Sequence, residues 1–114
     1  NHIHAAGSIA AAAAAARALH PTLPLIIEVE DLQELDQALA TGCDRILVDD
    51  FSLDALREAV RRAAGRTPLE VSGGVTLSRL AEIAACGVDY VSVGALTKHV
   101  QALDLSLRLG PPPR

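Results

Sequence analysis

The chain has 114 residues, of which 50% are hydrophobic, and it carries a formal net charge of −4 at neutral pH. This length allows one hydrophobic core, and no stretch approaches the roughly 20 apolar residues of a membrane span. Because the charge is negative and only 2% of the residues are aromatic, a nucleic-acid-binding surface is not expected. We expect a soluble cytoplasmic protein.

The N-terminal segment predicts a helix over residues 5–19, because residues 10–16 are all alanine, the strongest helix former. Ser8 is suited to cap the first full turn of this helix, and Pro21 follows its end. The chain begins with Asn1 rather than with Met. We therefore expect the sequence to be the inner part of a larger protein.

Four short apolar segments rich in β-branched residues follow, which is typical of parallel strands covered on both faces. They span 25–30, 45–50, 69–74 and 90–94. The amphipathic segments between them begin at capping residues, namely Asp31, Ser52 and Thr76, and end at Gly42, Gly65 and Gly87. Glu34 is placed to form a capping box with Asp31. The order βαβαβαβ predicts an α/β fold with a parallel sheet.

The chain contains an internal repeat, in which residues 40–49 align with residues 85–94 at an offset of 45 residues, or two β/α units. The offset pairs helix-ending glycines and strand-starting aspartates, namely Gly42 with Gly87 and Asp44 with Asp89. A regular period favours a barrel over a doubly wound sheet, in which the strand order reverses. A complete (β/α)₈ barrel needs about 250 residues. Residues 1–101 are therefore expected to form a partial (β/α) barrel of four parallel strands and covering helices.

The last segment predicts a further strand over residues 102–109, because leucine occupies every second position from Leu103 to Leu109. No helical segment follows it, and residues 110–114 predict a disordered tail. A strand with one apolar face needs a sheet to join. We expect this strand to pair with a domain or subunit that the sequence does not contain.

Two carboxylates stand at the ends of neighbouring predicted strands. Glu28 and Asp49 lie 21 residues apart, about one β/α unit, and the carboxyl ends of parallel strands meet at one edge of a sheet. Carboxylates there can hold Mg²⁺, accept hydrogen bonds from sugar hydroxyls or stabilise a developing cation. We assign Glu28 and Asp49 as candidate catalytic residues and candidate Mg²⁺ ligands. The alternative is a pair of solvated strand-end acids.

The other two strand ends are rich in glycine. Ser72-Gly73-Gly74 ends one strand, and Gly94 ends the next strand 22 residues after Ser72. The last two loops of β/α barrels commonly bind phosphate, and glycine lets the backbone approach the phosphate oxygens closely. We assign Ser72, Gly73, Gly94 and Lys98 as candidate substrate-binding residues, with His99 as a second nearby cation. The alternatives are glycines that serve only as turns and basic residues that are merely solvated. Pattern alone predicts a sugar-phosphate ligand.

Three further residues have structural explanations. Cys43 and Cys86 lack metal-ligand spacing and lie beside helix-ending glycines, so we expect buried free thiols. Glu70 lies inside a predicted strand among apolar neighbours. It either faces the barrel interior or forms a salt bridge.

In combination, these residues resemble the quinolinate phosphoribosyltransferases, the decarboxylating enzymes of NAD biosynthesis. The resemblance runs in order along nearly the whole chain. It rests on Asn1-His2-Ile3, Ala6-Gly7-Ser8, Glu28-Val29-Glu30, Leu47-Val48-Asp49-Asp50-Phe51 and the segments 69–75, 87–97 and 102–107.

The resemblance implies that quinolinate and phosphoribosyl pyrophosphate, with Mg²⁺, give nicotinate mononucleotide, pyrophosphate and CO₂. It places Glu28 and Asp49 near the ribose and the metal, where they stabilise an oxocarbenium-like centre as pyrophosphate leaves. Residues that match the family's 5′-phosphate positions are Ser72, Gly73 and Gly94, with Lys98 close by. It also implies a homodimer or higher oligomer of the full-length enzyme.

The chain departs from the family pattern at the mouth of the site. Asp50 replaces the usual Asn, and Ile26 replaces an acid often found two residues before Glu28. The family's earlier basic residues, including a lysine just before Asn1, are not in this sequence. An acidic half-site cannot hold two polyanions unaided. We therefore expect this polypeptide alone to be inactive and its full-length parent to be active.

Two alternative functions stay open. One is a related phosphoribosyltransferase-like protein, such as those of molybdenum-transport operons, or another phosphate-binding barrel. The other is a non-catalytic half-barrel that acts as an assembly module, because exposed barrel edges and an unpaired strand favour self-association.

Overall fold

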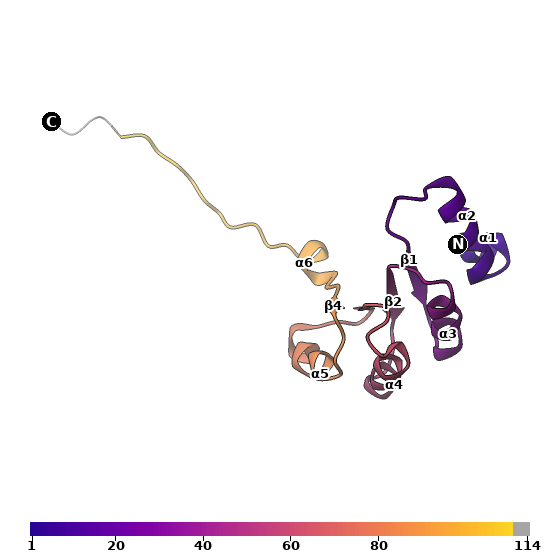
Figure 1. Cartoon of the computed structure of the whole chain (residues 1–114). Helices are drawn as coiled ribbons and strands as arrows, with labels where there is room; N and C mark the ends of the chain where they lie inside the picture. Colours follow the sequence, from indigo (N-terminus) through magenta and orange to yellow (C-terminus); the bar gives the residue numbers. More distant parts are fainter. Residues whose placement is uncertain (111–114) are drawn as a thin grey trace.

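The computed structural model describes residues 1–110, and its centre is a parallel sheet (Figure 1). In this part of the chain, four strands pair in sequence order, β1–β2–β3–β4. Their bounds are β1 Ile26–Val29, β2 Arg45–Asp49, β3 Leu69–Ser72 and β4 Tyr90–Val91. The predicted α/β fold with four parallel strands is confirmed, and a strand order without reversal is that of a barrel segment.

Helices connect the strands, and α3, α4 and α5 follow one another along one side of the sheet (Figure 1). The bounds are α1 His2–Ala6, α2 Ile9–Leu19, α3 Leu32–Ala40, α4 Leu53–Ala63, α5 Leu80–Ala84 and α6 Ala95–Lys98, with a 3₁₀ turn, η1 Leu77–Arg79, before α5. Within residues 1–110, no helix has the length and apolar character needed to cross a membrane.

The two faces of the sheet differ in burial, because successive side chains of a strand alternate between them. The helix-covered face forms the core and carries Ile27, Val29, Ile46, Val48, Leu69 and Val71, each at most 5% exposed. The opposite face, called here the open face, carries Ile26, Glu28, Arg45, Leu47, Asp49, Glu70, Ser72 and Tyr90, which are exposed or half-buried. In a closed barrel, the corresponding face is the interior.

Apolar stripes on the helices complete the core. Leu35 of α3, Leu56 of α4 and Ile83 of α5 are at most 1% exposed. Full burial of such a side chain contributes about 1.5–3 kcal/mol. The burial of these residues therefore fixes which side of each helix faces the sheet.

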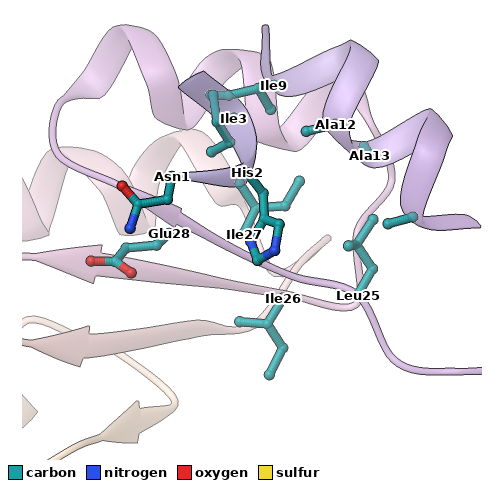
Figure 2. Close-up of a pocket in the computed structure, with 11 residues that line it drawn as sticks. Asn1, His2, Ile3, Ile9, Ala12, Ala13, Leu25, Ile26, Ile27 and Glu28 are labelled. Atoms are coloured by element: carbon teal, nitrogen blue, oxygen red, sulfur yellow. The ribbon is translucent and has the colours of Figure 1, made fainter. Parts of the chain in front are cut away.

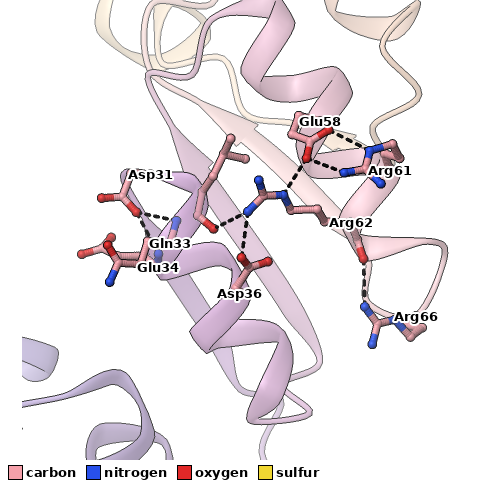
Figure 3. A network of polar contacts seen from close by, with 9 residues as sticks. Asp31, Gln33, Glu34, Asp36, Glu58, Arg61, Arg62 and Arg66 are labelled. Atoms are coloured by element: carbon pink, nitrogen blue, oxygen red, sulfur yellow. Dashed lines mark hydrogen bonds and ion pairs between the residues drawn. The ribbon is translucent and has the colours of Figure 1, made fainter.

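A polar network links α3 and α4 on the outer surface (Figure 3). Arg62 donates hydrogen bonds to Asp36 and to Glu58, both at 2.7 Å. Arg61 donates to both oxygens of Glu58. The hydrogen bonds from Arg61 and Arg62 lower the pKa of Glu58 to about 2. The network therefore links the outer surfaces of α3 and α4.

The internal repeat has a physical basis in the two aspartates. Asp44 accepts a hydrogen bond from the backbone N–H of Leu25 at 2.8 Å, and Asp89 accepts one from the N–H of Leu69 at 2.8 Å. Each aspartate therefore ties the start of its own strand to the start of the preceding strand. The predicted structural role of these aspartates agrees with both contacts.

The N-terminal helix predicted over residues 5–19 is two helices, so this prediction is corrected. α1 ends at Gly7, which adopts a left-handed conformation with φ 82°. Ser8 then caps α2 by accepting a hydrogen bond from the N–H of Ala11 at 3.1 Å, which confirms the predicted cap. High alanine propensity does not carry the helix across Gly7, because glycine readily adopts φ above zero and ends helices there.

Two capping predictions also change. Asp31 caps α3 by accepting hydrogen bonds in its first turn, as predicted. However, Glu34 accepts from the N–H of Glu30, one residue before the cap, rather than from that of Asp31. Thr76 precedes the 3₁₀ turn η1, and its hydroxyl bonds to the Ser78 hydroxyl at 3.0 Å instead of capping a helix.

The fourth strand is shorter than the predicted segment 90–94. β4 covers only Tyr90–Val91, although the N–H of Ser92 still donates to the carbonyl of Val71 at 2.8 Å. The chain then turns into α6. The sheet therefore ends with a narrow edge at β4.

The strand predicted over residues 102–109 does not form within the described chain. After α6 the backbone leads away from the body (Figure 1), and Leu103, Leu105, Leu107 and Leu109 are 81–94% exposed. An isolated strand has no neighbour to satisfy its backbone hydrogen bonds. Its pairing with another domain, and a domain limit near residue 101, stay predictions. Of the predicted tail 110–114, residues 111–114 lie outside the described residues.

Both cysteines are buried free thiols, as predicted. Cys43 is 5% exposed and Cys86 is 7% exposed. Burial raises the pKa of the Cys43 thiol. A thiol that stays protonated and buried is a poor nucleophile, which fits a packing role.

Candidate functional site

A cavity of about 620 Å³ lies at the carboxyl edge of β2, β3 and β4. Its lining combines a carboxylate, hydroxyls, glycine backbone and basic side chains, including Asp49, Ser72, Gly73, Gly94, Lys98 and His99. Asp49 and Ser72 are register partners, so they lie level on the open face. The structure thus brings together all four predicted substrate-binding residues and one of the two predicted catalytic acids.

Gly73 shapes the wall of this cavity. It has φ 80°, and a Cβ atom there would lie 2.8 Å from both Asp49 Oδ1 and the Asp50 nitrogen. The Asp50 N–H donates to the carbonyl of Ser72 at 3.1 Å. Asp50 itself has φ 55°, a left-handed conformation that, apart from glycine, mainly asparagine and aspartate adopt. The ends of β2 and β3 are therefore packed backbone to backbone.

Lys98 brings positive charge to the same cavity from α6. Its side chain folds back over Gly94, so that Nζ lies 3.8 Å from the position a Cβ of Gly94 would occupy. Lys98 and Gly94 are both exposed at the rim. The cavity thus combines the Lys98 ammonium with exposed backbone, a combination suited to a small anion.

Glu28 does not line this cavity. It lines a separate hollow of about 360 Å³ at the free edge of β1, together with Asn1, His2 and Ile26. Figure 2 shows the side chains of Asn1 and Glu28 at the same end of this hollow. Glu28 pairs with Leu47 in the sheet register, two residues before Asp49. Both acids lie on the open face, but Glu28 is two register positions farther than Asp49 from the carboxyl edge of the sheet.

The two acids provide limited capacity for a metal ion. Within residues 1–110, no group of three or more His, Cys, Asp or Glu side chains could hold one. Magnesium is usually bound through one or two carboxylates, with water and substrate phosphates completing its shell. Glu28 and Asp49 therefore do not form a cage of protein ligands, and an ion at either carboxylate would need water and a phosphate-bearing ligand to complete its shell.

Next to the cavity lies a set of polar contacts around Glu70, whose partners the sequence did not identify. Glu70 on β3 accepts a hydrogen bond from Arg45 at 2.9 Å and a second from the Ser92 hydroxyl. Arg45 also lies 4.0 Å from the ring centroid of Tyr90. Both interpretations of Glu70 hold, because it faces the barrel-interior side and forms a salt bridge. The sequence did contain one signal for this position: Glu70 and Ser72 are two residues apart in a strand and therefore lie on the same face.

Comparison with protein families gives one match that covers most of the chain. The model described as quinolinate phosphoribosyl transferase, C-terminal domain, matches residues 1–108. The match includes both candidate acids and all of the candidate phosphate-binding residues.

Similar proteins extend this finding. A nicotinate-nucleotide pyrophosphorylase [carboxylating] of Mycobacterium leprae is 45% identical over 112 residues, which are 96% of this chain and 39% of that protein. Among solved structures, the nicotinate-nucleotide pyrophosphorylase of Francisella tularensis has a TM-score of 0.81 at 43% identity and covers 86% of this chain and 36% of its own. NadC of Streptococcus pyogenes has a TM-score of 0.87 at 38% identity, over 95% and 38%. The chain therefore spans about two fifths of the length of these relatives.

Proposed function

The chain belongs to the quinolinate phosphoribosyltransferase family, whose C-terminal domain its residues 1–108 match, and from this premise we propose that it supplies one half of a phosphoribosyltransferase active site. The complete site converts quinolinate and phosphoribosyl pyrophosphate into nicotinate mononucleotide, pyrophosphate and CO₂, as a step of NAD biosynthesis in the cytoplasm. The observation that carries the proposal is the cavity in which Asp49 meets Ser72, Gly73, Gly94 and Lys98.

The order of the strands suggests how the substrate lies. The 5′-phosphate occupies the cavity above β3 and β4, where Gly73 and Gly94 expose backbone and Lys98 adds charge. The ribose then extends over β2 and β1, toward Asp49 and Glu28. Their carboxylates stabilise the positive charge that develops on the ribose carbon as pyrophosphate leaves.

A magnesium ion fits the same arrangement. Glu28 and Asp49 are the residues that would hold it, and the ion would neutralise charge on the pyrophosphate. Removal of divalent cations with EDTA should abolish turnover, and added Mg²⁺ should restore it. Turnover that persists in EDTA would rule out this part of the proposal.

The test is quinolinate-dependent release of CO₂ by the complete gene product that carries this chain. We expect Asp49→Asn and Glu28→Gln each to lower kcat by roughly 10²–10³-fold. Asp54→Asn is the matched control, because Asp54 lies on α4 in an exposed ion pair with Arg57. Wild-type kinetics in the Asp49 variant would contradict the proposal.

The 114-residue polypeptide alone should release no CO₂ or pyrophosphate. Its net charge is −4, and two polyanionic substrates need more positive charge than its cavity provides. We propose that this charge comes from the remainder of a longer protein and from a neighbouring subunit in a homodimer or higher oligomer. Pyrophosphate release by residues 1–114 alone would contradict this.

The exposed leucines of residues 103–109 fit the same picture. We propose that this segment becomes a strand when it pairs with a domain or subunit outside the described chain. Amide exchange tests this. We expect slow exchange over 103–109 in the complete oligomer and fast exchange in the isolated 114-residue chain. Slow exchange in the isolated chain would refute it.

One observation favours a second candidate, a non-catalytic assembly module. Ile26 and Tyr90 on the open face are 50% and 47% exposed, and exposed apolar surface promotes association. Light scattering with and without phosphoribosyl pyrophosphate separates the two. Self-association that ignores the ligand, together with absent turnover in the complete gene product, would favour assembly.

A further inference from the structure

Four residues of the open face form one connected unit, called here the Arg45 cluster: Arg45, Glu70, Tyr90 and Ser92. One carboxylate oxygen of Glu70 accepts from Arg45 at 2.9 Å, and the other accepts from the Ser92 hydroxyl. The guanidinium of Arg45 lies 4.0 Å from the centroid of the Tyr90 ring. Arg45 is therefore held between a carboxylate and an aromatic ring, which limits its freedom to move.

The Arg45 cluster adjoins the 620 Å³ cavity through Ser92. Ser92 belongs to both, since it lines the cavity and donates to Glu70. Glu70 is two residues before Ser72 on the same face of β3. The Glu70 carboxylate is thus separated from the cavity by a single hydroxyl group.

This position creates an electrostatic problem for an anionic ligand. Asp49 already lines the cavity, and a second unpaired carboxylate one hydroxyl away would repel a phosphate. Ser92 offers no compensation, because its only hydroxyl proton is donated to Glu70. Arg45 is the group that neutralises Glu70, and its side chain is 33% exposed against 16% for Glu70.

We propose that Arg45 is a positioning residue for phosphate binding: it neutralises Glu70 and so keeps the floor of the cavity from repelling the phosphate group. The bond between Glu70 and Ser92 is retained while the negative charge is compensated. The inference rests on the proposed function only in taking the ligand of the cavity to be a phosphate.

The test uses the complete gene product and inorganic phosphate as the probe, with binding measured by calorimetry. Arg45→Met should weaken phosphate binding roughly three- to tenfold, since it leaves Glu70 unpaired. Glu70→Gln alone should tighten binding, because its amide oxygen still accepts from Ser92 while the charge is gone. The double variant R45M/E70Q should return to within about twofold of wild type.

Arg57→Met is the matched control, since it removes the same charge from an exposed ion pair on α4. It should leave phosphate binding unchanged. In turnover assays, R45M should raise KM for phosphoribosyl pyrophosphate more than it lowers kcat. A purely structural role for Arg45 predicts the opposite for Glu70→Gln, namely weaker binding.

Unchanged phosphate binding in R45M, or weaker binding in E70Q, overturns the inference. If R45M fails to fold, E70Q still decides, because only charge relief makes it bind phosphate more tightly. If the variants show the expected pattern of phosphate binding but the wild-type protein releases no CO₂, the inference is supported and only the proposed function is refuted. Normal release of CO₂ with unchanged binding in R45M refutes only the inference.

Discussion

A Cβ atom on Gly73 would lie 2.8 Å from the Asp49 carboxylate oxygen Oδ1, closer than nonbonded atoms approach. The loop after β3 therefore sits against the end of β2 without space for any side chain. The shape of the glycine loop and the position of the acid depend on each other. A substitution at either residue should therefore alter both the glycine loop and the position of the Asp49 carboxylate.

We predict that Gly73→Ala destabilises the chain by about 1–3 kcal/mol, because alanine at φ 80° is strained and meets Asp49 and the Asp50 backbone. Phosphate binding should be lost with it. Gly42→Ala is the control: Gly42 has φ 64° but nothing within 4 Å of its Cβ position. It should cost only the backbone strain, about 1 kcal/mol, and keep phosphate binding. Urea unfolding and calorimetry measure both, and equal effects would show that the contact is unimportant.

Ala64→Gly should stabilise the chain by about 1 kcal/mol. Ala64 is the exposed C-cap of α4 and adopts φ 49°, which glycine reaches without a steric penalty. Ala14→Gly, at an exposed position inside α2, should instead destabilise by about 1 kcal/mol. Urea midpoints that move in the same direction for both variants would contradict this assignment.

The stability of the chain should depend on Glu58 in acid. Because Arg61 and Arg62 lower the pKa of Glu58 from 4.5 to about 2, its carboxylate stabilises the fold above pH 4.5. This contribution is lost as the pH falls from 4.5 toward 2. Glu58→Gln should therefore be less stable than wild type at pH 7, with the difference in free energy of unfolding shrinking toward pH 2. Chemical unfolding at several pH values measures this, and a difference independent of pH would be inconsistent with it.

Leu35→Ala should destabilise the chain by about 2–5 kcal/mol, because Leu35 is fully buried between α3 and the sheet and the change leaves a cavity. Leu77→Ala is the control, since Leu77 in η1 is 86% exposed. Its effect should stay within about 0.5 kcal/mol. Comparable losses for the two leucines would mean that Leu77 packs against a surface outside the described chain.

The sheet could be predicted from the sequence because the β/α period leaves physical marks along the chain. Asp44 and Asp89 repeat because each accepts a backbone hydrogen bond from the start of the preceding strand. Helix starts at Ser8, Asp31 and Ser52 were equally visible, because a side-chain oxygen satisfies N–H groups that a helix leaves free. These are local interactions, and local sequence encodes them.

The N-terminal helix and the C-terminal strand were harder for opposite reasons. Alanine propensity suggested one continuous helix, whereas a single glycine conformation at Gly7 divides it. For residues 102–109 the alternation of leucine is real, but a strand forms only beside another strand. Propensity cannot supply a partner.

The position of Glu28 relative to Asp49 was also beyond the sequence, because strand register is not evenly spaced. The register offset is 19 residues between β1 and β2 (Ile26 with Arg45) and 23 residues between β2 and β3 (Ile46 with Leu69). Equal spacing along the chain therefore does not give equal height at the rim. A salt bridge of Glu70 was one of the predicted alternatives, but Arg45 was not identified as the partner, because the two residues are 25 positions apart in the chain.

The open face of the sheet has a consequence for any ligand at its rim. A phosphate ester bound over Ser72 and Gly94 would be touched by protein on the sheet side and would keep much of its hydration shell on the other. Electrostatic attraction through that water is weak. Protein on the second side of the ester is therefore needed to bind it tightly and to exclude water before it reacts.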